Sequence, residues 1–170
     1  MDEKIIFRKA EKADAERIME IIAQAKEQMR LRGSRQWQDG YPAMENIRND
    51  IEKGYGFVLE YEAITIAYAA VIFDGEPAYN LIEGRWLSNC PYVVVHRLAV
   101  ADEMKNRGVA TGFMRRIEQY ARECGLRSFR IDTNFDNEFM LKMLDRLGFA
   151  FCGEVRMRSG LRRAYEKLLF

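Results

Sequence analysis

Residues 96–111 read HRLAVADEMKNRGVAT, and this stretch carries a strand pattern through a loop into a helix. Three consecutive valines stand just before it, so the apolar, β-branched pattern predicts a strand over residues 92–100. Beyond the loop, a helix is expected to begin near Gly108, bury one apolar face and end at Gly125. The start of such a helix combines backbone N–H groups that lack partners with the positive end of the helix dipole. The stretch therefore predicts a diphosphate-binding loop.

The side chains of this loop suit the same ligand. Gly108 lets a ligand approach the backbone closely, and Ala110 has only a small side chain in the first helical turn. Lys105 and Arg107 add positive charge, while Thr111 adds a hydroxyl. The pattern K-x-x-G-x-A is weak when taken alone, because a plain basic loop before a helix shares it. The residues expected to hold the diphosphate are Lys105, Asn106, Arg107, Gly108, Val109, Ala110 and Thr111.

The rest of the chain predicts helices interleaved with a mostly antiparallel sheet of about seven strands. Strands are expected over residues 5–9, 55–60, 64–73, 92–100, 128–133, 149–156 and 161–170. Helices are expected from Asp14 to Gly33, from Pro42 to Gly54, from Gly108 to Gly125 and from Asn137 to Gly148. The order βααβββαβαββ indicates a layered domain of the α/β or α+β class.

Residues 74–91 lack a clear hydrophobic period and form the longest expected connection. A functional loop is plausible there, and the sequence leaves open whether it gates a site. Its lone Trp86 is expected to anchor the loop.

Length and composition exclude several classes of protein. With 170 residues and 48% apolar content, the chain suits a single domain over residues 1–170. The chain has 27 Lys and Arg and 26 Asp and Glu, so its net charge of +1 does not indicate a nucleic-acid partner. No apolar run reaches the ~20 residues of a membrane span, and no signal peptide is expected. Three scattered cysteines and one histidine favour reduced thiols in the cytoplasm and no metal.

Two motifs resemble those of the GNAT acetyltransferase superfamily. The first contains, in order, Leu98-x-Val100, the acidic pair Asp102-Glu103, and Lys105-x-x-Gly108-x-Ala110, where the family usually has Gln or Arg in place of Lys105. The second is a helix opened by Asn137 with Met140 at +3 and Gly148-Phe149 after it. The resemblance extends over the whole chain in element order and implies the GNAT fold.

The resemblance also implies acetyl-CoA as co-substrate, with its diphosphate held by residues 105–111. The backbones of Leu98 and Val100 would pair with the pantetheine arm as an added strand. Asn137 would hydrogen-bond the pantetheine near its thiol end, although a plain helix N-cap also explains this residue. No metal is implied.

In this family the amine attacks the thioester directly in a ternary complex. A primary amine with a pKa of ~10.4 must lose a proton, so a base or a water chain is needed. The leaving thiolate has a pKa of ~8.5, so a general acid is less necessary. The Tyr that often serves as this acid is Leu144 here.

His96 is the leading candidate for the base, although it also suits a hydrogen-bonded position inside the sheet. Asp132 at the end of the fifth strand could accept the ammonium or orient His96, and it could equally cap the following loop.

The acceptor is expected to be the primary amine of a small molecule or peptide. Trp37 and Tyr41 could line the binding pocket of such an amine through cation–π contact, or they could only anchor a long loop. The arginines at 156, 158, 162 and 163 could attract an acidic acceptor, or could form a solvated face. A GNAT-fold module that binds CoA without turnover is the alternative function. The sequence leaves monomer and homodimer open.

Overall fold

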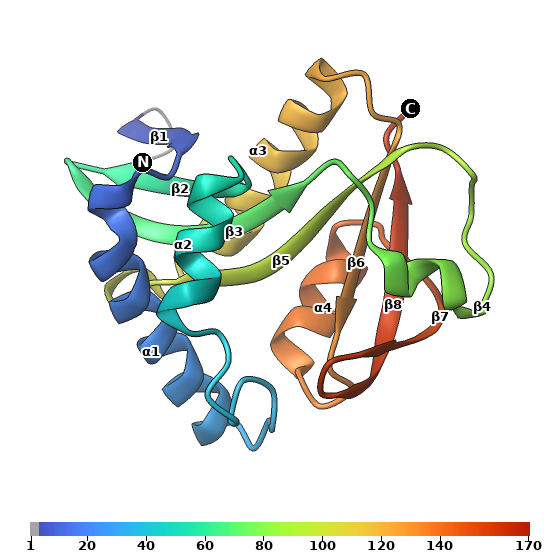
Figure 1. Cartoon of the computed structure of the whole chain (residues 1–170), viewed down its shortest axis with the longest axis horizontal. Helices are drawn as coiled ribbons and strands as arrows, with labels where there is room; N and C mark the ends of the chain where they lie inside the picture. The colour runs from blue at the N-terminus through green and yellow to red at the C-terminus, as the bar shows by residue number, and fades with distance from the viewer. Residues whose placement is uncertain (1–3) are drawn as a thin grey trace. The chain divides into compact units, whose positions relative to one another are not determined.

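The computed structural model, drawn in Figure 1, describes residues 4–170. The chain divides into two compact units. Unit 1 contains the chain up to Val71 together with His96–Arg116. Unit 2 contains Ile72–Val95 and Ile117–Phe170. Within residues 4–170, no helix is long and apolar enough to cross a membrane.

Eight strands form one mixed sheet in the order β1-β2-β3-β5-β6-β8-β7-β4. Their bounds are β1 Ile5–Lys9, β2 Gly56–Tyr61, β3 Ile64–Ile72, β4 Glu83–Gly84, β5 Tyr92–Val100, β6 Ser128–Thr133, β7 Ala150–Met157 and β8 Gly160–Leu168. The β5–β6 pair is parallel, whereas β1–β2, β2–β3, β4–β7, β6–β8 and β7–β8 are antiparallel. The predicted class, a mixed and mostly antiparallel sheet with flanking helices, is confirmed. The two-residue strand β4, inside the expected loop 74–91, brings the strands from about seven to eight.

The four α-helices are α1 Ala15–Leu31, α2 Met44–Glu52, α3 Val109–Glu123 and α4 Glu138–Arg146. Short 3₁₀ turns are η2 Lys12–Asp14, η3 Pro77–Leu81 and η4 Asp102–Met104. The glycines expected to end the helices, at 33, 54, 125 and 148, all have positive φ.

One predicted helix start, that of α2, is wrong by two residues. Pro42 was expected to open α2, but the helix begins at Met44, because the Asn46 side chain accepts the Ala43 N–H at 2.8 Å and fixes the first turn there. Asp14 is the N-cap residue of α1, as predicted, although its side chain makes no capping hydrogen bond to that helix. Its carboxylate instead accepts the Glu11 N–H at 2.7 Å, one turn earlier, and so belongs to η2.

The core of unit 1 lies between two helices and three strands. Helices α1 and α2, which lie next to each other in Figure 1, contribute the fully buried Ile18 and Ile47, while the strands contribute Val58, Tyr68 and Ala99. Successive strand residues point to opposite faces, so the neighbours of these strand residues face away from α1 and α2.

A second apolar contact in unit 1 joins the ends of the sheet to α3. Phe7 of β1 stacks on Phe57 of β2 with ring centroids 5.1 Å apart, and meets Phe113 of α3 edge-on at 6.1 Å. Phe113 is fully buried, which places the first turns of α3 firmly against the strands.

In unit 2, a buried polar network holds part of the loop 74–91 in place. Glu166 of β8 is fully buried and accepts hydrogen bonds from the Leu87 N–H at 2.6 Å and the Ser88 hydroxyl at 2.7 Å. Arg130 of β6 pairs with Glu166 at 3.3 Å and lies 4.3 Å from the Trp86 ring. Trp86 therefore anchors the loop, as predicted.

Two strands of unit 2 approach so closely that both need glycine. In the antiparallel β4–β7 pair, Gly84 lies opposite Gly153. A Cβ on Gly84 would lie 2.2 Å from the Cys152 carbonyl oxygen, and one on Gly153 would lie 2.2 Å from the Glu83 oxygen. Both distances are far below van der Waals contact, so no side chain fits at either position.

Candidate functional site

The loop between β5 and α3 is fastened to α1 by the acidic pair of the first motif. The Asp102 N–H donates to the Gln24 side chain at 2.9 Å, and the Gln28 amide donates to the Asp102 carboxylate. Arg17 pairs with Glu103. The acidic residues therefore hold the loop in place, a structural role that the sequence alone did not reveal.

The turn that follows opens the start of α3 to solvent. Asn106 and Gly108 have φ of 60° and 74°, so the backbone turns twice through the left-handed region before the helix begins at Val109. A Cβ on Gly108 would meet no atom within 4 Å. Gly112 donates its N–H back to the Gly108 carbonyl at 2.9 Å, and the N–H groups before it come at the start of the helix, where intrahelical acceptors are lacking. The residues present therefore fit the diphosphate of acetyl-CoA.

The charge at this turn is modestly positive. Lys105 lies 3.4 Å from Asp102, so part of its charge is offset, and both side chains are substantially exposed. Arg107 is exposed. Together with the dipole of the 15-residue helix α3, these two cations favour an anion in the open space above Gly108.

Strand β5, which leads into the loop, contains one residue with an unusual backbone conformation. Arg97 has φ of 58°, a left-handed conformation in the middle of the strand. Its guanidinium forms two hydrogen bonds with Asp50 of α2, at 2.8 and 2.6 Å, and donates a third to the Tyr41 hydroxyl at 2.6 Å. The Tyr68 hydroxyl donates to the same Asp50 carboxylate at 2.5 Å.

This cluster of Arg97, Asp50, Tyr68 and Tyr41 was missed by the sequence reading. Asp50 is only 1% exposed although it lies in an amphipathic helix, where an acidic residue normally faces solvent. Burial and the Asp50 charge raise the pKa of Tyr68 well above its ordinary range, so its hydroxyl remains a hydrogen-bond donor.

The two aromatic residues predicted to meet the acceptor are differently placed. Trp37 is 6% exposed and packs in the core of unit 1, which agrees with the alternative that it pins the loop. Tyr41 is half-buried and contacts Arg97. Lys26 of α1 donates to the Pro42 carbonyl at 2.8 Å and so holds the end of this loop against α1. A role for Trp37 or Tyr41 in acceptor binding stays a prediction.

The predicted catalytic and pantetheine-binding residues lie in both units. His96 is half-buried in unit 1, directly before Arg97. Asp132 in unit 2 accepts the Tyr79 hydroxyl at 2.6 Å. Asn137, also in unit 2, caps α4 by accepting the Met140 N–H at 3.2 Å. The N-cap reading of Asn137 is thus present in the structure, and the catalytic roles stay predictions.

Three further residues, Leu144, Tyr165 and Cys152, are buried. Leu144, where the family often has a Tyr acid, is fully buried in α4. Tyr165 and Cys152 are each 8% exposed, and burial raises the pKa of the Cys152 thiol. No group of three or more His, Cys, Asp and Glu that could hold a metal occurs within residues 4–170.

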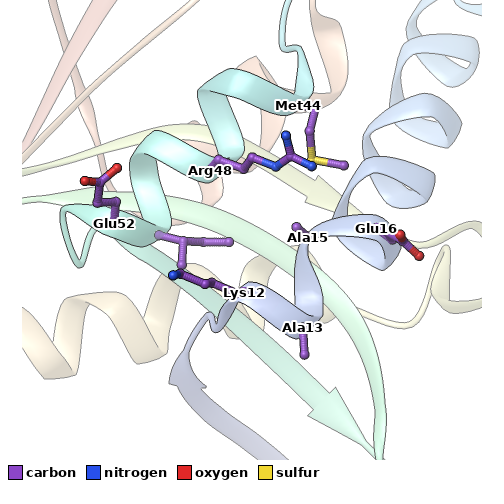
Figure 2. A pocket seen from close by; sticks show the side chains of 8 residues that line it. Lys12, Ala13, Ala15, Glu16, Met44, Arg48 and Glu52 are labelled. Carbon is purple, nitrogen blue, oxygen red and sulfur yellow. The ribbon is translucent and has the colours of Figure 1, made fainter.

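A groove in unit 1 lies apart from all these positions. It has a volume of about 750 Å³ and runs between the start of α1 and one face of α2 (Figure 2). Its lining mixes basic, acidic and apolar side chains: Lys12, Ala13, Ala15, Glu16, Met44, Arg48, Ile51 and Glu52. None of these belongs to the predicted site.

Comparison with known proteins decides the family. The sequence profile described as the acetyltransferase (GNAT) family matches residues 15–149, which covers both motifs. The chain belongs to the GNAT acetyltransferase family. No curated protein matches the chain at a significant level.

Solved structures of other GNAT proteins share the fold. A GNAT acetyltransferase from Streptococcus agalactiae is 35% identical, with 96% of this chain and 95% of that one covered and a TM-score of 0.88. A GNAT acetyltransferase from Listeria monocytogenes is 22% identical, with 96% and 94% covered and a TM-score of 0.77. An acetyltransferase from Salmonella typhimurium, solved with its cofactor acetyl-CoA, is 19% identical, with 98% and 94% covered and a TM-score of 0.69.

Proposed function

We propose that this GNAT protein is an acetyl-CoA-dependent N-acetyltransferase that acetylates the primary amine of a small molecule or peptide. The observation that carries the proposal is the open, left-handed Gly108 at the start of α3, where a diphosphate can reach backbone N–H groups. Family membership supports an acetyl donor, and the Salmonella structure with acetyl-CoA shows that the same fold accommodates this cofactor.

Three parts of acetyl-CoA would be held by different residues of the chain. The N–H groups at the start of α3 would take the diphosphate, with Lys105, Arg107 and Thr111 around it. Leu98 and Val100 would offer their backbone groups to the pantetheine amides. Because the Asn137 side-chain oxygen already caps α4, a contact of Asn137 with pantetheine would use its amide nitrogen.

The transfer itself would be a direct attack in a ternary complex. The neutral amine nitrogen forms a bond with the acetyl carbonyl carbon, the C–S bond breaks, and CoA leaves as a thiolate. The acylated nitrogen then loses its second proton to solvent, and the thiolate is protonated. The proton lost by the ammonium would pass to His96, with Asp132 or a water chain as the other candidates. Since Leu144 is buried and apolar, the thiolate would take its proton from water or from another residue.

A second function draws support from the same Leu144. A GNAT-fold module that binds CoA without turnover needs no acid, so the replacement of the usual Tyr favours it. The two functions share acetyl-CoA binding and differ in whether thiol is released.

Two measurements test the proposal. Acetyl-CoA should raise the melting temperature, because a ligand that binds only the folded state stabilises it by ~2.7 kcal/mol at a hundredfold excess over Kd. CoA thiol should then be released in the presence of amino acids, polyamines, aminoglycosides or peptide N-termini. An unchanged melting curve at millimolar acetyl-CoA contradicts the cofactor assignment. Binding without thiol release from any of these pools favours the silent module.

A further inference from the structure

The backbone of β5 passes through the left-handed region at a residue type that does not favour this conformation. Arg97 has φ of 58° inside the strand, whereas the other non-glycine residues with positive φ among residues 4–170 lie in turns. Apart from glycine, only Asn and Asp adopt this region readily, because a Cβ crowds the following carbonyl. The conformation of Arg97 must therefore be held by contacts made elsewhere.

The contacts that hold it are those of its side chain. Each of the three guanidinium nitrogens donates a hydrogen bond, two to Asp50 and one to Tyr41, at 2.6–2.8 Å. The Asp50 side chain is 2% exposed and that of Arg97 is 13% exposed, so solvent screens the pair little. The Tyr68 hydroxyl adds a further hydrogen bond to Asp50. A planar, bidentate pair of this kind fixes direction as well as distance.

The left-handed conformation of Arg97 sets the direction of the backbone groups that follow it. Its φ and ψ set the plane of the peptide that joins Arg97 to Leu98, and hence the directions of the Leu98 N–H and carbonyl. These are the groups that the proposed function assigns to the pantetheine arm. We infer that Asp50 is a positioning residue, which holds Arg97 in its left-handed conformation and thereby aims the Leu98–Val100 backbone at acetyl-CoA. This inference rests on the proposed function, because it concerns the same cofactor.

Two substitutions at one position separate this role from general stabilisation. Arg97→Gly and Arg97→Ala both remove the side chain and leave Asp50 equally unpaired. Glycine adopts the left-handed region readily and alanine does not. In an ordinary strand position glycine destabilises the fold more than alanine does. If the Arg97 side chain only stabilises the fold, Arg97→Gly should therefore bind acetyl-CoA more weakly than Arg97→Ala. The positioning role predicts the opposite order.

The readout is the dissociation constant of acetyl-CoA, measured by calorimetry, with the melting temperature of each variant beside it. Arg97→Ala should bind about tenfold more weakly than the wild type, because its backbone relaxes toward the extended form and binding must restore the turn. Arg97→Gly should stay within about threefold of the wild type, because both conformations remain accessible to it. Equal affinities of the two variants, or weaker binding with glycine, overturn the inference.

A second pair of variants tests Asp50 itself. Asp50→Asn should weaken acetyl-CoA binding, because the amide offers Arg97 a single acceptor oxygen and no charge. Adding Arg97→Gly should restore affinity toward that of Arg97→Gly alone, since glycine no longer needs to be held. A double variant as weak as Asp50→Asn contradicts the positioning role. The double variant also removes the unpaired buried charge, so it can be measured even where Asp50→Asn unfolds.

Failure of the inference is distinguishable from failure of the proposed function. If the wild-type protein binds no acetyl-CoA, the proposed function is wrong. If the wild type binds and the Gly and Ala variants do not differ, the function stands and Asp50 only stabilises the fold.

Discussion

The Tyr79 hydroxyl donates a hydrogen bond of 2.6 Å to one carboxylate oxygen of Asp132. The other Asp132 oxygen lies 3.6 Å from the Arg162 guanidinium, and the Asp132 side chain is 3% exposed. Complete burial, and then the negative charge of Asp132, raise the pKa of Tyr79 well above its ordinary range. Tyr79 therefore stays protonated and remains a hydrogen-bond donor to Asp132.

Asp132→Asn tests which role this carboxylate has. If Asp132 takes part in proton transfer, kcat should fall by ~10²-fold or more with acetyl-CoA affinity retained. If it only balances Arg162 and Tyr79, the melting temperature should fall and activity should follow it. Tyr79→Phe is the complementary variant, because it removes the hydrogen bond to Asp132 and leaves the charge of the carboxylate. Equal loss of kcat in both variants contradicts a catalytic Asp132.

Gly108→Ala should weaken acetyl-CoA binding. At φ of 74°, the left-handed conformation costs an alanine ~1–2 kcal/mol of folding free energy. The added Cβ also points into the space assigned to the diphosphate. Gly125→Ala at the other end of α3 is the control, since φ is 83° there and a Cβ also meets no atom. Both variants should lose similar stability by thermal unfolding, and only Gly108→Ala should change the Kd by calorimetry. If both bind alike, the loop does not hold the diphosphate.

His96→Ala should lower kcat by ~10²–10⁴ while acetyl-CoA affinity stays nearly unchanged, because proton removal does not involve the diphosphate. Steady-state kinetics across pH and thermal stability of the same variant form the measurement. Full activity, or a loss explained wholly by unfolding, returns His96 to a structural role.

Stability should fall in acid partly through Asp14. Hydrogen bonding from Arg8, at 2.8 and 2.9 Å, holds the pKa of the Asp14 carboxyl below its ordinary value of 3.8. A carboxyl whose pKa is lowered on folding stabilises the protein above its unfolded pKa, and this stability is lost as pH falls through the folded pKa. Asp14→Asn should therefore have a lower melting temperature than the wild type at pH 7, and the difference in melting temperature should disappear below about pH 4. Glu16→Gln, an exposed carboxylate of α1, should show no such difference.

Glu166→Gln should loosen the loop 74–91. The substitution removes the counter-ion of the buried Arg130, and breaking a buried pair on one side costs about 3–5 kcal/mol. The amide also offers fewer acceptors to Leu87 and Ser88. The variant should melt earlier and be cut by trypsin within this loop, whereas Glu154→Gln on the exposed side of β7 should resist as the wild type does. Protection of the Glu166→Gln loop argues that other contacts hold it.

The parts of the fold that the sequence predicted depend on local chemistry. Helix ends at glycine, the β-branched run before His96 and the turn at Gly108 all follow from residues within a few positions of each other. The same holds for the N-cap of Asn137. Each of these features therefore stands close to where the pattern placed it.

The features that the sequence did not predict join residues far apart in the chain. Asp50 and Arg97 are 47 positions apart, and nothing near Asp50 marks it as buried. Strand β4 exists only through pairing with β7, so its two residues carry no strand pattern of their own. Buried polar pairs and short strands of this kind are set by tertiary contacts, which a reading of local periodicity does not contain.

The facing glycines of β4 and β7 also limit how this protein can diverge. Because each Cβ would lie 2.2 Å from a backbone oxygen of the other strand, neither Gly84 nor Gly153 can be replaced alone without moving the strands apart. A homologue with a side chain at one of these positions must therefore have a displaced or missing β4. The pair can serve as a sequence marker for relatives that keep this edge of the sheet.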